Sequence, residues 1–225
     1  MMVARPLAIT VNAEVRVSAL LQVPPDARTC YVFAHGAGAG MHHPFMAAVA
    51  AGLAERGIAT LRYQFPYMER GSKRPDLPPL AHATVRAAAA EATRVLPDFA
   101  LIAGGKSFGG RMTSQAQAGA ALPNVRGLAF LGFPLHPPKR PSIERAAHLS
   151  KIETPMLFLQ GTRDELADLS LLEPLVRKLG AATLHRLDHA DHSFHVLARS
   201  GRNDADVLNE LLGALTAWIR RIAAG

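Results

Sequence analysis

Short apolar runs alternate with helical patterns along most of this chain, and that alternation constrains the fold more than any other feature. We expect buried strands at 30–34, 58–62, 99–103, 125–131, 156–160 and 183–187. We expect helices over 44–56, 80–96, 108–119, 171–179 and 204–223. Because strands separated by helices pair in parallel and are covered on both faces, the pattern predicts a mostly parallel α/β sheet.

Two more strands are expected before this alternation begins, at 7–11 and 15–21, joined by a turn at 12–14. A connection this short predicts that they pair antiparallel. The length of 225 residues suits one α/β unit, so we expect a single domain spanning 1–225. No internal repeat or low-complexity linker argues for a second one.

The beginning of the chain alternates apolar and polar residues and does not form the continuous apolar core of a signal peptide. No apolar run reaches the roughly 18 residues that a membrane-spanning helix needs. The single cysteine, Cys30, lies in an apolar run and is expected to be buried. We therefore expect a cytoplasmic protein without membrane attachment.

Basic residues exceed acidic ones by 25 to 18, which gives a net charge of +7. They are scattered, with no run of five and no interleaved aromatic residues. This distribution is typical of a solvated basic surface, so we expect no nucleic-acid partner. A basic rim around a site would be compatible with anionic substrates.

The residues Gly105-Lys106-Ser107-Phe108-Gly109 form a G-x-S-x-G motif between a predicted strand and a predicted helix. In such a motif the serine lies on a sharp strand-to-helix turn and acts as a nucleophile. A phosphate-binding loop would need glycine at position 100, where Ala100 stands. The remaining alternative is a structural turn with an inert serine.

A serine nucleophile needs two N–H groups for the oxyanion, and one is expected from Phe108, the next residue. The other is expected from Ala37, in the glycine-rich stretch 36–40 that follows a predicted strand. That stretch reads G-x-G-x-G and lacks the spacing of a dinucleotide fingerprint. His35, at its start, is expected to support the loop by hydrogen bonding.

The acid and the base should follow the serine in the order serine, acid, histidine. Asp164 follows the strand at 156–160 and is our candidate acid, with Glu165 and Asp168 as rivals. His192 is our candidate base, in a loop that also contains His189 and His195. Three histidines at this spacing could instead bind a metal, but no cysteine or paired-histidine motif accompanies them.

Five segments together resemble the α/β-hydrolase superfamily over nearly the whole chain: 35–38, 62–67, 105–112, 160–164 and 190–194. More narrowly, they resemble a dienelactone-hydrolase-like subgroup. It includes the mammalian testis-expressed protein thirty and the hydrolase-like subunit of the non-specific-lethal acetyltransferase complex. The resemblance implies an α/β-hydrolase fold with a mostly parallel twisted sheet of about seven to eight strands, helices on both faces and minimal or no cap. It also implies a Ser107–Asp164–His192 triad, whereas the thiol nucleophile of dienelactone hydrolase itself is replaced by Ser107.

We therefore expect a carboxylesterase-like serine hydrolase that cleaves a small ester or thioester through an acyl-enzyme, without cofactor or metal. The alternative is a catalytically idle interaction module on the same fold. Little of the chain is left to cover the site, so we expect an open pocket. Its candidate lining residues are His35, Tyr63, Phe65, Tyr67, Phe133 and His136.

Overall fold

The computed structural model describes residues 3–224 and contains an eight-stranded sheet within them. Its strands are β1 (Arg5–Thr10), β2 (Arg16–Gln22), β3 (Thr29–Ala34), β4 (Ala59–Tyr63), β5 (Ala100–Lys106), β6 (Val125–Leu131), β7 (Met156–Gly161) and β8 (Ala182–Leu187). The α-helices are α1 (Pro44–Ala54), α2 (Pro66–Glu69), α3 (Pro78–Val95), α4 (Phe108–Gly119), α5 (Leu169–Lys178) and α6 (Asp204–Ala224). Two 3₁₀ helices complete the set, η1 (Glu144–Lys151) and η2 (Ala198–Ser200).

The strands lie in the order β1-β2-β4-β3-β5-β6-β7-β8. The β1–β2 and β2–β4 pairs are antiparallel, and every pair from β4–β3 through β7–β8 is parallel. This confirms the mostly parallel sheet and the antiparallel start that the sequence predicts. The carboxyl ends of the parallel strands therefore meet at one edge of the sheet, where ligands bind in open α/β sheets.

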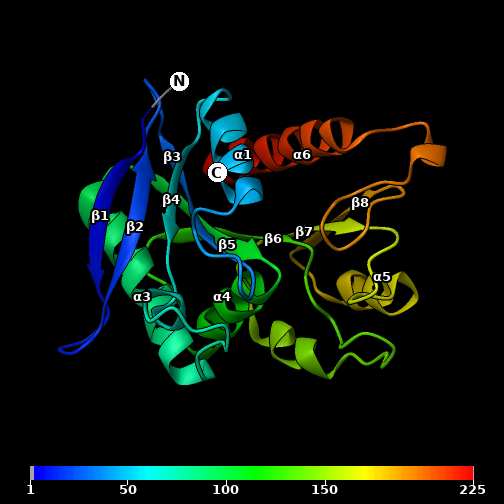
Figure 1. The fold of residues 1–225 in the computed structure, drawn as a ribbon, viewed down its shortest axis with the longest axis horizontal. Helices are drawn as coiled ribbons and strands as arrows, with labels where there is room; N and C mark the ends of the chain where they lie inside the picture. Colours follow the sequence, from blue (N-terminus) through cyan, green and yellow to red (C-terminus); the bar gives the residue numbers. More distant parts are fainter. Residues whose placement is uncertain (1–2, 225) are drawn as a thin grey trace.

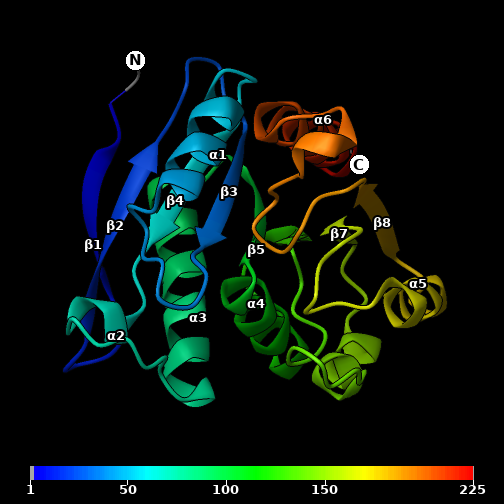
Figure 2. The same ribbon diagram turned by 45° about the vertical axis from the view of Figure 1, so that its right-hand side comes forward.

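Helices cover both faces of the sheet, as Figures 1 and 2 show. Helices α1 and α6 pack on one face, over a core cluster that includes Val49, Leu211 and Trp218. Helices α3, α4 and α5 pack on the other, over a cluster that includes Val85 and Met112. Each face thus has its own hydrophobic core, which fixes the sheet between two helical layers and holds its strand ends in place.

Local signals explain several helix starts. Pro44 stands at the first position of α1, and the imidazole of His43 accepts a hydrogen bond from the N–H of Phe45 at 3.2 Å. Asp168 caps α5 by accepting from the N–H of Ser170 at 2.9 Å. The buried face of α3 is largely alanine, so α3 and the neighbouring α4 can pack closely.

Three short helices were not predicted from the sequence. Helix α2 lies in the proline-rich segment 64–79, which the sequence suggests is a loop, η1 follows a second proline-rich segment, 133–141, and η2 has only three residues. Cys30 is fully buried, as expected.

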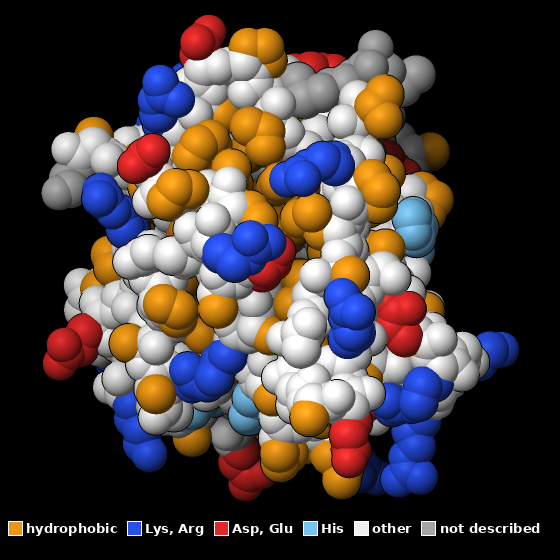
Figure 3. Space-filling view, turned by 90° about the vertical axis from the view of Figure 1, so that its left-hand side faces the viewer, with side chains coloured by type: hydrophobic (Ala, Val, Ile, Leu, Met, Phe, Trp, Pro, Cys, Tyr) orange, Lys and Arg blue, Asp and Glu red, His pale blue; other side chains and the backbone are white. Residues whose placement is uncertain are grey.

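The surface seen from the side of β1 carries Lys and Arg side chains mostly as separate groups among apolar and uncharged ones (Figure 3). This agrees with the scattered basic residues of the sequence on the face that the figure shows. Among residues 3–224, the helices are all too short or too polar to cross a bilayer.

Candidate active site

Ser107 is the single residue between β5 and α4, and it has φ 49° and ψ −115°. A non-glycine residue with positive φ is strained and persists only where its surroundings hold it. Its N–H donates to the carbonyl of Leu131 on β6 at 3.1 Å. Gly109 permits the tight turn, because a Cβ there would lie 2.6 Å from the carbonyl oxygens of Ala34 and His35.

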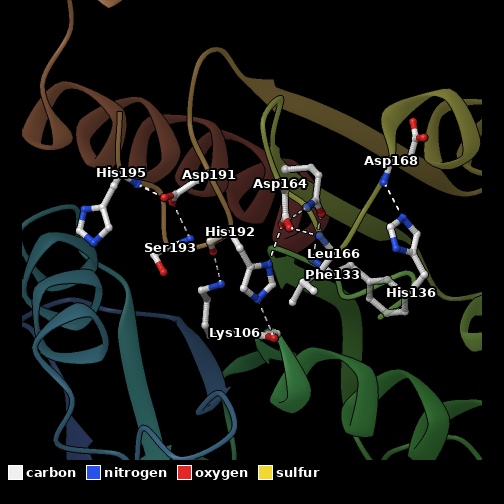
Figure 4. A network of polar contacts seen from close by, with 12 residues as sticks. Lys106, Phe133, His136, Asp164, Leu166, Asp168, Asp191, His192, Ser193 and His195 are labelled. Atoms are coloured by element: carbon white, nitrogen blue, oxygen red, sulfur yellow. Dashed lines mark hydrogen bonds and ion pairs between the residues drawn. The ribbon is translucent and has the colours of Figure 1, made fainter. Parts of the chain in front are cut away.

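Three predicted side chains from distant parts of the chain form one hydrogen-bonded line (Figure 4). Nε2 of His192 lies 2.8 Å from Oγ of Ser107, and Nδ1 lies 2.7 Å from Oδ2 of Asp164. The Asp164 side chain is 0% exposed and that of His192 is 24% exposed. The imidazole is therefore open to a ligand on the serine side and supported from a buried carboxylate on the other.

Asp164 is fixed by further hydrogen bonds. Its Oδ1 accepts from the N–H of Leu166 at 2.8 Å, and its Oδ2 also accepts from the side-chain amide of Gln160. The amide oxygen of Gln160 in turn accepts from the N–H of Phe133 at 2.9 Å. This network ties the carboxylate to the ends of β6 and β7 and leaves it one orientation toward His192.

The rival residues have other partners. His195 pairs with Asp204 at 2.6 Å between Nδ1 and Oδ2, and His189 is exposed. Asp168 caps α5, and Glu165 is exposed. Within the described residues, no group of three or more His, Cys, Asp or Glu side chains is placed to hold a metal ion.

The loop that carries His192 is closed by Asp191. Its carboxylate accepts from the N–H groups of Ser193 at 2.8 Å and His195 at 2.9 Å, and its own N–H donates to the carbonyl of His195 (Figure 4). Lys106 donates to the carbonyl of His192 at 2.5 Å, and its Nζ lies 5.0 Å from the centre of the Phe194 ring. Burial lowers the pKa of Lys106 to about 8. His192 is thus held in place by Asp191 within its own loop and by Lys106 at the end of β5.

The N–H groups of Ala37 and Phe108 lie in the loop after β3 and at the start of α4. Neither donates a hydrogen bond to another group among residues 3–224. The next N–H, that of Gly38, donates to the hydroxyl of Tyr67 at 2.9 Å, which fixes the loop. Two unpaired donors at a helix start and a glycine-rich loop are suited to an anionic oxygen.

His35 supports this loop from below. Its Nδ1 donates to the carbonyl of Gly36 at 2.8 Å, and its Nε2 accepts from the N–H of Phe65 at 3.1 Å. This pattern requires the neutral imidazole, and burial lowers the pKa of His35 to about 4. His35 is therefore a buried structural histidine and does not line a pocket beside Ser107.

Two pockets flank Ser107 and share Ala37, Ser107 and Leu166 in their walls. The larger one, about 680 Å³, is also lined by His192 and by apolar side chains of α1 such as Phe45. The smaller one, about 340 Å³, extends along α4. Ser107 thus lies between two cavities, a larger one next to α1 and His192 and a smaller one along α4.

The expected aromatic pocket lining requires a correction. Tyr63, Phe65, Tyr67 and Phe133 are 0–1% exposed and belong to the core cluster on the face of the sheet that α3 and α4 cover. His136 is also buried; its Nε2 accepts from the N–H of Asp168 at 2.9 Å, and it lines a separate cavity. These rings support the site from within and do not form the walls beside Ser107.

Residues 27–220 match the family described as Alpha/beta hydrolase domain. The chain belongs to this family. Several solved α/β-hydrolase structures resemble it over almost their whole length. A lidless α/β serine hydrolase from Xanthomonas campestris is 22% identical, with 99% of this chain and 96% of that chain covered and a TM-score of 0.74.

Two others have the same overall shape. A dienelactone hydrolase from Anabaena variabilis is 20% identical, with coverage of 97% for each chain and a TM-score of 0.76. Est1E from Butyrivibrio proteoclasticus, with ferulic acid bound, is 14% identical, with coverage of 97% and 100% and a TM-score of 0.76. At these identities the likeness establishes the α/β-hydrolase fold of this chain.

Sequence reasoning missed several residues around the site of this α/β hydrolase. Gln160 orients Asp164, Leu166 separates the two pockets, and Lys106 holds the histidine loop. Lys106 and Gln160 carried a signal, because Lys106 is next to the serine in its motif and Gln160 begins one of the segments that resemble the superfamily. Leu166 could not be identified, since a leucine in a loop has no pattern that distinguishes a pocket wall from a core position.

Proposed function

We propose that this α/β hydrolase cleaves a small ester or thioester through a covalent acyl-enzyme on Ser107. The observation that carries the proposal is the line from Ser107 through His192 to Asp164, next to two unpaired N–H groups. A hydroxyl, an imidazole and a carboxylate in this order are the parts that nucleophilic acyl transfer requires.

In the first half of the reaction, His192 takes the proton of Ser107 as Oγ attacks the acyl carbon. The electrons of the carbonyl double bond move to oxygen, and the N–H groups of Ala37 and Phe108 hydrogen-bond the resulting oxyanion. The intermediate then breaks the bond to the leaving group. His192 gives its proton to the departing alcohol or thiol, and the acyl group stays on Ser107.

In the second half, a water molecule gives a proton to His192 and attacks the acyl carbon. The second oxyanion collapses, the bond to Oγ breaks, and Ser107 regains its proton from His192. The free acid leaves. Asp164 accepts a hydrogen bond from Nδ1 throughout, which keeps Nε2 facing the serine and stabilises the imidazolium.

The larger pocket supports a small, partly apolar substrate group, because Phe45, Met46 and Leu166 line it next to Ser107. The similar structures include Est1E with ferulic acid bound and a dienelactone hydrolase. These names support ester chemistry in general. The narrower subgroup resemblance to testis-expressed protein thirty remains a prediction from the sequence motifs.

The test is labelling with a fluorophosphonate probe, followed by identification of the modified peptide. We expect one adduct, on Ser107, and hydrolysis of 4-nitrophenyl acetate and butyrate. Ser107→Ala should abolish both, whereas Ser150→Ala, at an exposed serine outside both pockets, should change neither. Folded protein that neither labels nor turns over any ester would contradict the proposal and favour an idle module.

A further inference from the structure

Two arginine side chains line the smaller pocket beside Ser107. Arg111 lies in the first turn of α4, and its N–H donates to the carbonyl of Ser107 at 3.1 Å. Arg145 lies in η1, which packs against α4. Two guanidinium groups from separate elements therefore face one cavity that also contains the candidate nucleophile.

Neither guanidinium has a partner among the described residues: no hydrogen bond or ion pair within 3–224 involves the side chain of Arg111 or Arg145. The Nε of Arg111 is buried and makes no hydrogen bond. A buried N–H of a charged group without an acceptor costs free energy, so it marks a place where an acceptor is missing.

The two guanidinium groups repel each other, and the nearby His148 is held neutral. Burial and the nearby Arg145 lower the pKa of Arg111, and burial together with Arg111 lowers the pKa of His148 to about 4. The one carboxylate in the pocket wall is that of Asp76, and both its oxygens are occupied. One accepts from the N–H of Tyr67 at 2.9 Å and the other from Arg70 at 2.7 Å.

We propose that this pocket is an anion subsite, and that the preferred ester carries a carboxylate on the part that enters it. The inference rests on the proposed function, because it assigns a substrate class to the same nucleophile. Arginine binds carboxylates through parallel N–H donors, and two half-buried guanidinium groups in one pocket favour an anion over a neutral group of the same shape.

The test compares matched esters. One pair places the carboxylate on the acyl side, as mono(4-nitrophenyl) adipate and its methyl ester. The other places it on the leaving group, as 3-acetoxybenzoate and its methyl ester. We expect kcat/KM to favour the anionic member in at least one pair by about ten-fold or more, the effect of a charge-assisted hydrogen bond.

Arg111→Gln and Arg145→Gln should each lower kcat/KM for that anionic ester by about ten-fold to a hundred-fold and leave its neutral partner within about two-fold. Arg140→Gln removes the same charge at an exposed position outside the pocket and should leave the preference unchanged. The rate of fluorophosphonate labelling of Ser107 checks that each variant keeps a folded site.

Equal rates within both pairs would overturn the subsite, as would a loss of preference in Arg140→Gln equal to that in Arg111→Gln. The proposed function would survive either result, because the neutral esters would still be cleaved. If none of the four esters is cleaved and Ser107 is not labelled, the proposed function fails and the subsite fails with it.

Discussion

The ammonium group of Lys106 donates a hydrogen bond of 2.5 Å to the main-chain carbonyl of His192. Lys106 ends β5 and directly precedes Ser107, so neighbouring residues of one strand hold the candidate nucleophile and the loop of its candidate base. The contact links β5 to the loop of the candidate base through one half-buried side chain.

We expect Lys106→Met to lower kcat by about ten-fold or more, because small displacements of a catalytic group reduce rates strongly. KM should change less, since both pockets keep their other walls. Steady-state kinetics with 4-nitrophenyl butyrate checks this, and Lys151→Met, at an exposed lysine, is the control. Unchanged kcat in the Lys106 variant would show that the loop holds His192 without this contact.

Replacing Asp164 by asparagine should lower kcat by about a thousand-fold or more while leaving the fold intact. The carboxylate accepts from Leu166 on one oxygen and from Gln160 and His192 on the other, whereas an asparagine amide has only one acceptor oxygen, so the imidazole loses its orientation. The rival acidic residues provide the controls: Glu165→Gln and Asp168→Asn should keep near-normal kcat. A larger loss in either control would move the role of the acid away from Asp164.

His35 predicts a pH dependence of stability. Its pKa falls from 6.5 to about 4 on folding, so between these values the unfolded chain binds a proton that the native protein does not. The stability present above pH 6.5 is therefore lost as pH falls through 4, by about 3 kcal/mol from this residue.

Urea unfolding at several pH values measures this effect. The free energy of unfolding of His35→Gln should fall less steeply between pH 6.5 and 4 than that of the wild type. His148 also has a lowered pKa, and its contribution remains in both proteins, so the difference between them isolates His35. Parallel curves would contradict the assignment of a neutral buried imidazole.

Gly132→Ala should be destabilising by about 1–3 kcal/mol and should also reduce activity. Gly132 has φ +66°, and a Cβ there would lie 2.9 Å from Nζ of Lys106 and 3.5 Å from the His192 ring. The substitution both strains the backbone and displaces the Lys106 ammonium group from the carbonyl of His192. Gly180→Ala, where a Cβ would meet nothing within 4 Å, is the matched control for thermal unfolding and kcat.

Much of the fold could be predicted because the apolar periodicity of most segments agrees with the Gly and Pro residues at their ends. The bounds of α4 and β6 are those expected, and α1 begins at Pro44 as predicted. Three short helices were missed: α2 lies in a proline-rich segment without a clear apolar period, η1 follows another, and η2 has only three residues. The conformation of α2 and η1 depends on packing against α3 and α4, which local sequence does not record.

The site could be predicted only in part. The strand–serine–helix motif and the order of acid and histidine identify residues because both follow from chain connectivity. The aromatic residues at the ends of β4 and β6 were misplaced, since a ring at a strand end can point into a cavity or into the core with the same sequence. Arg111 and Arg145 were not identified, because only the structure shows that their side chains line one pocket and have no hydrogen-bonding partners among residues 3–224.

The sharp turn between β5 and α4 consists of Ser107 alone. Arg111 follows it by four positions, which is slightly more than one helical turn, or about 6 Å of rise. If Arg111 binds an anionic group of the substrate, the distance between that group and the scissile bond is fixed by the geometry of α4 and not by a flexible loop. Inserting one residue there would rotate α4 by about 100°, so reactivity and substrate choice would be lost together.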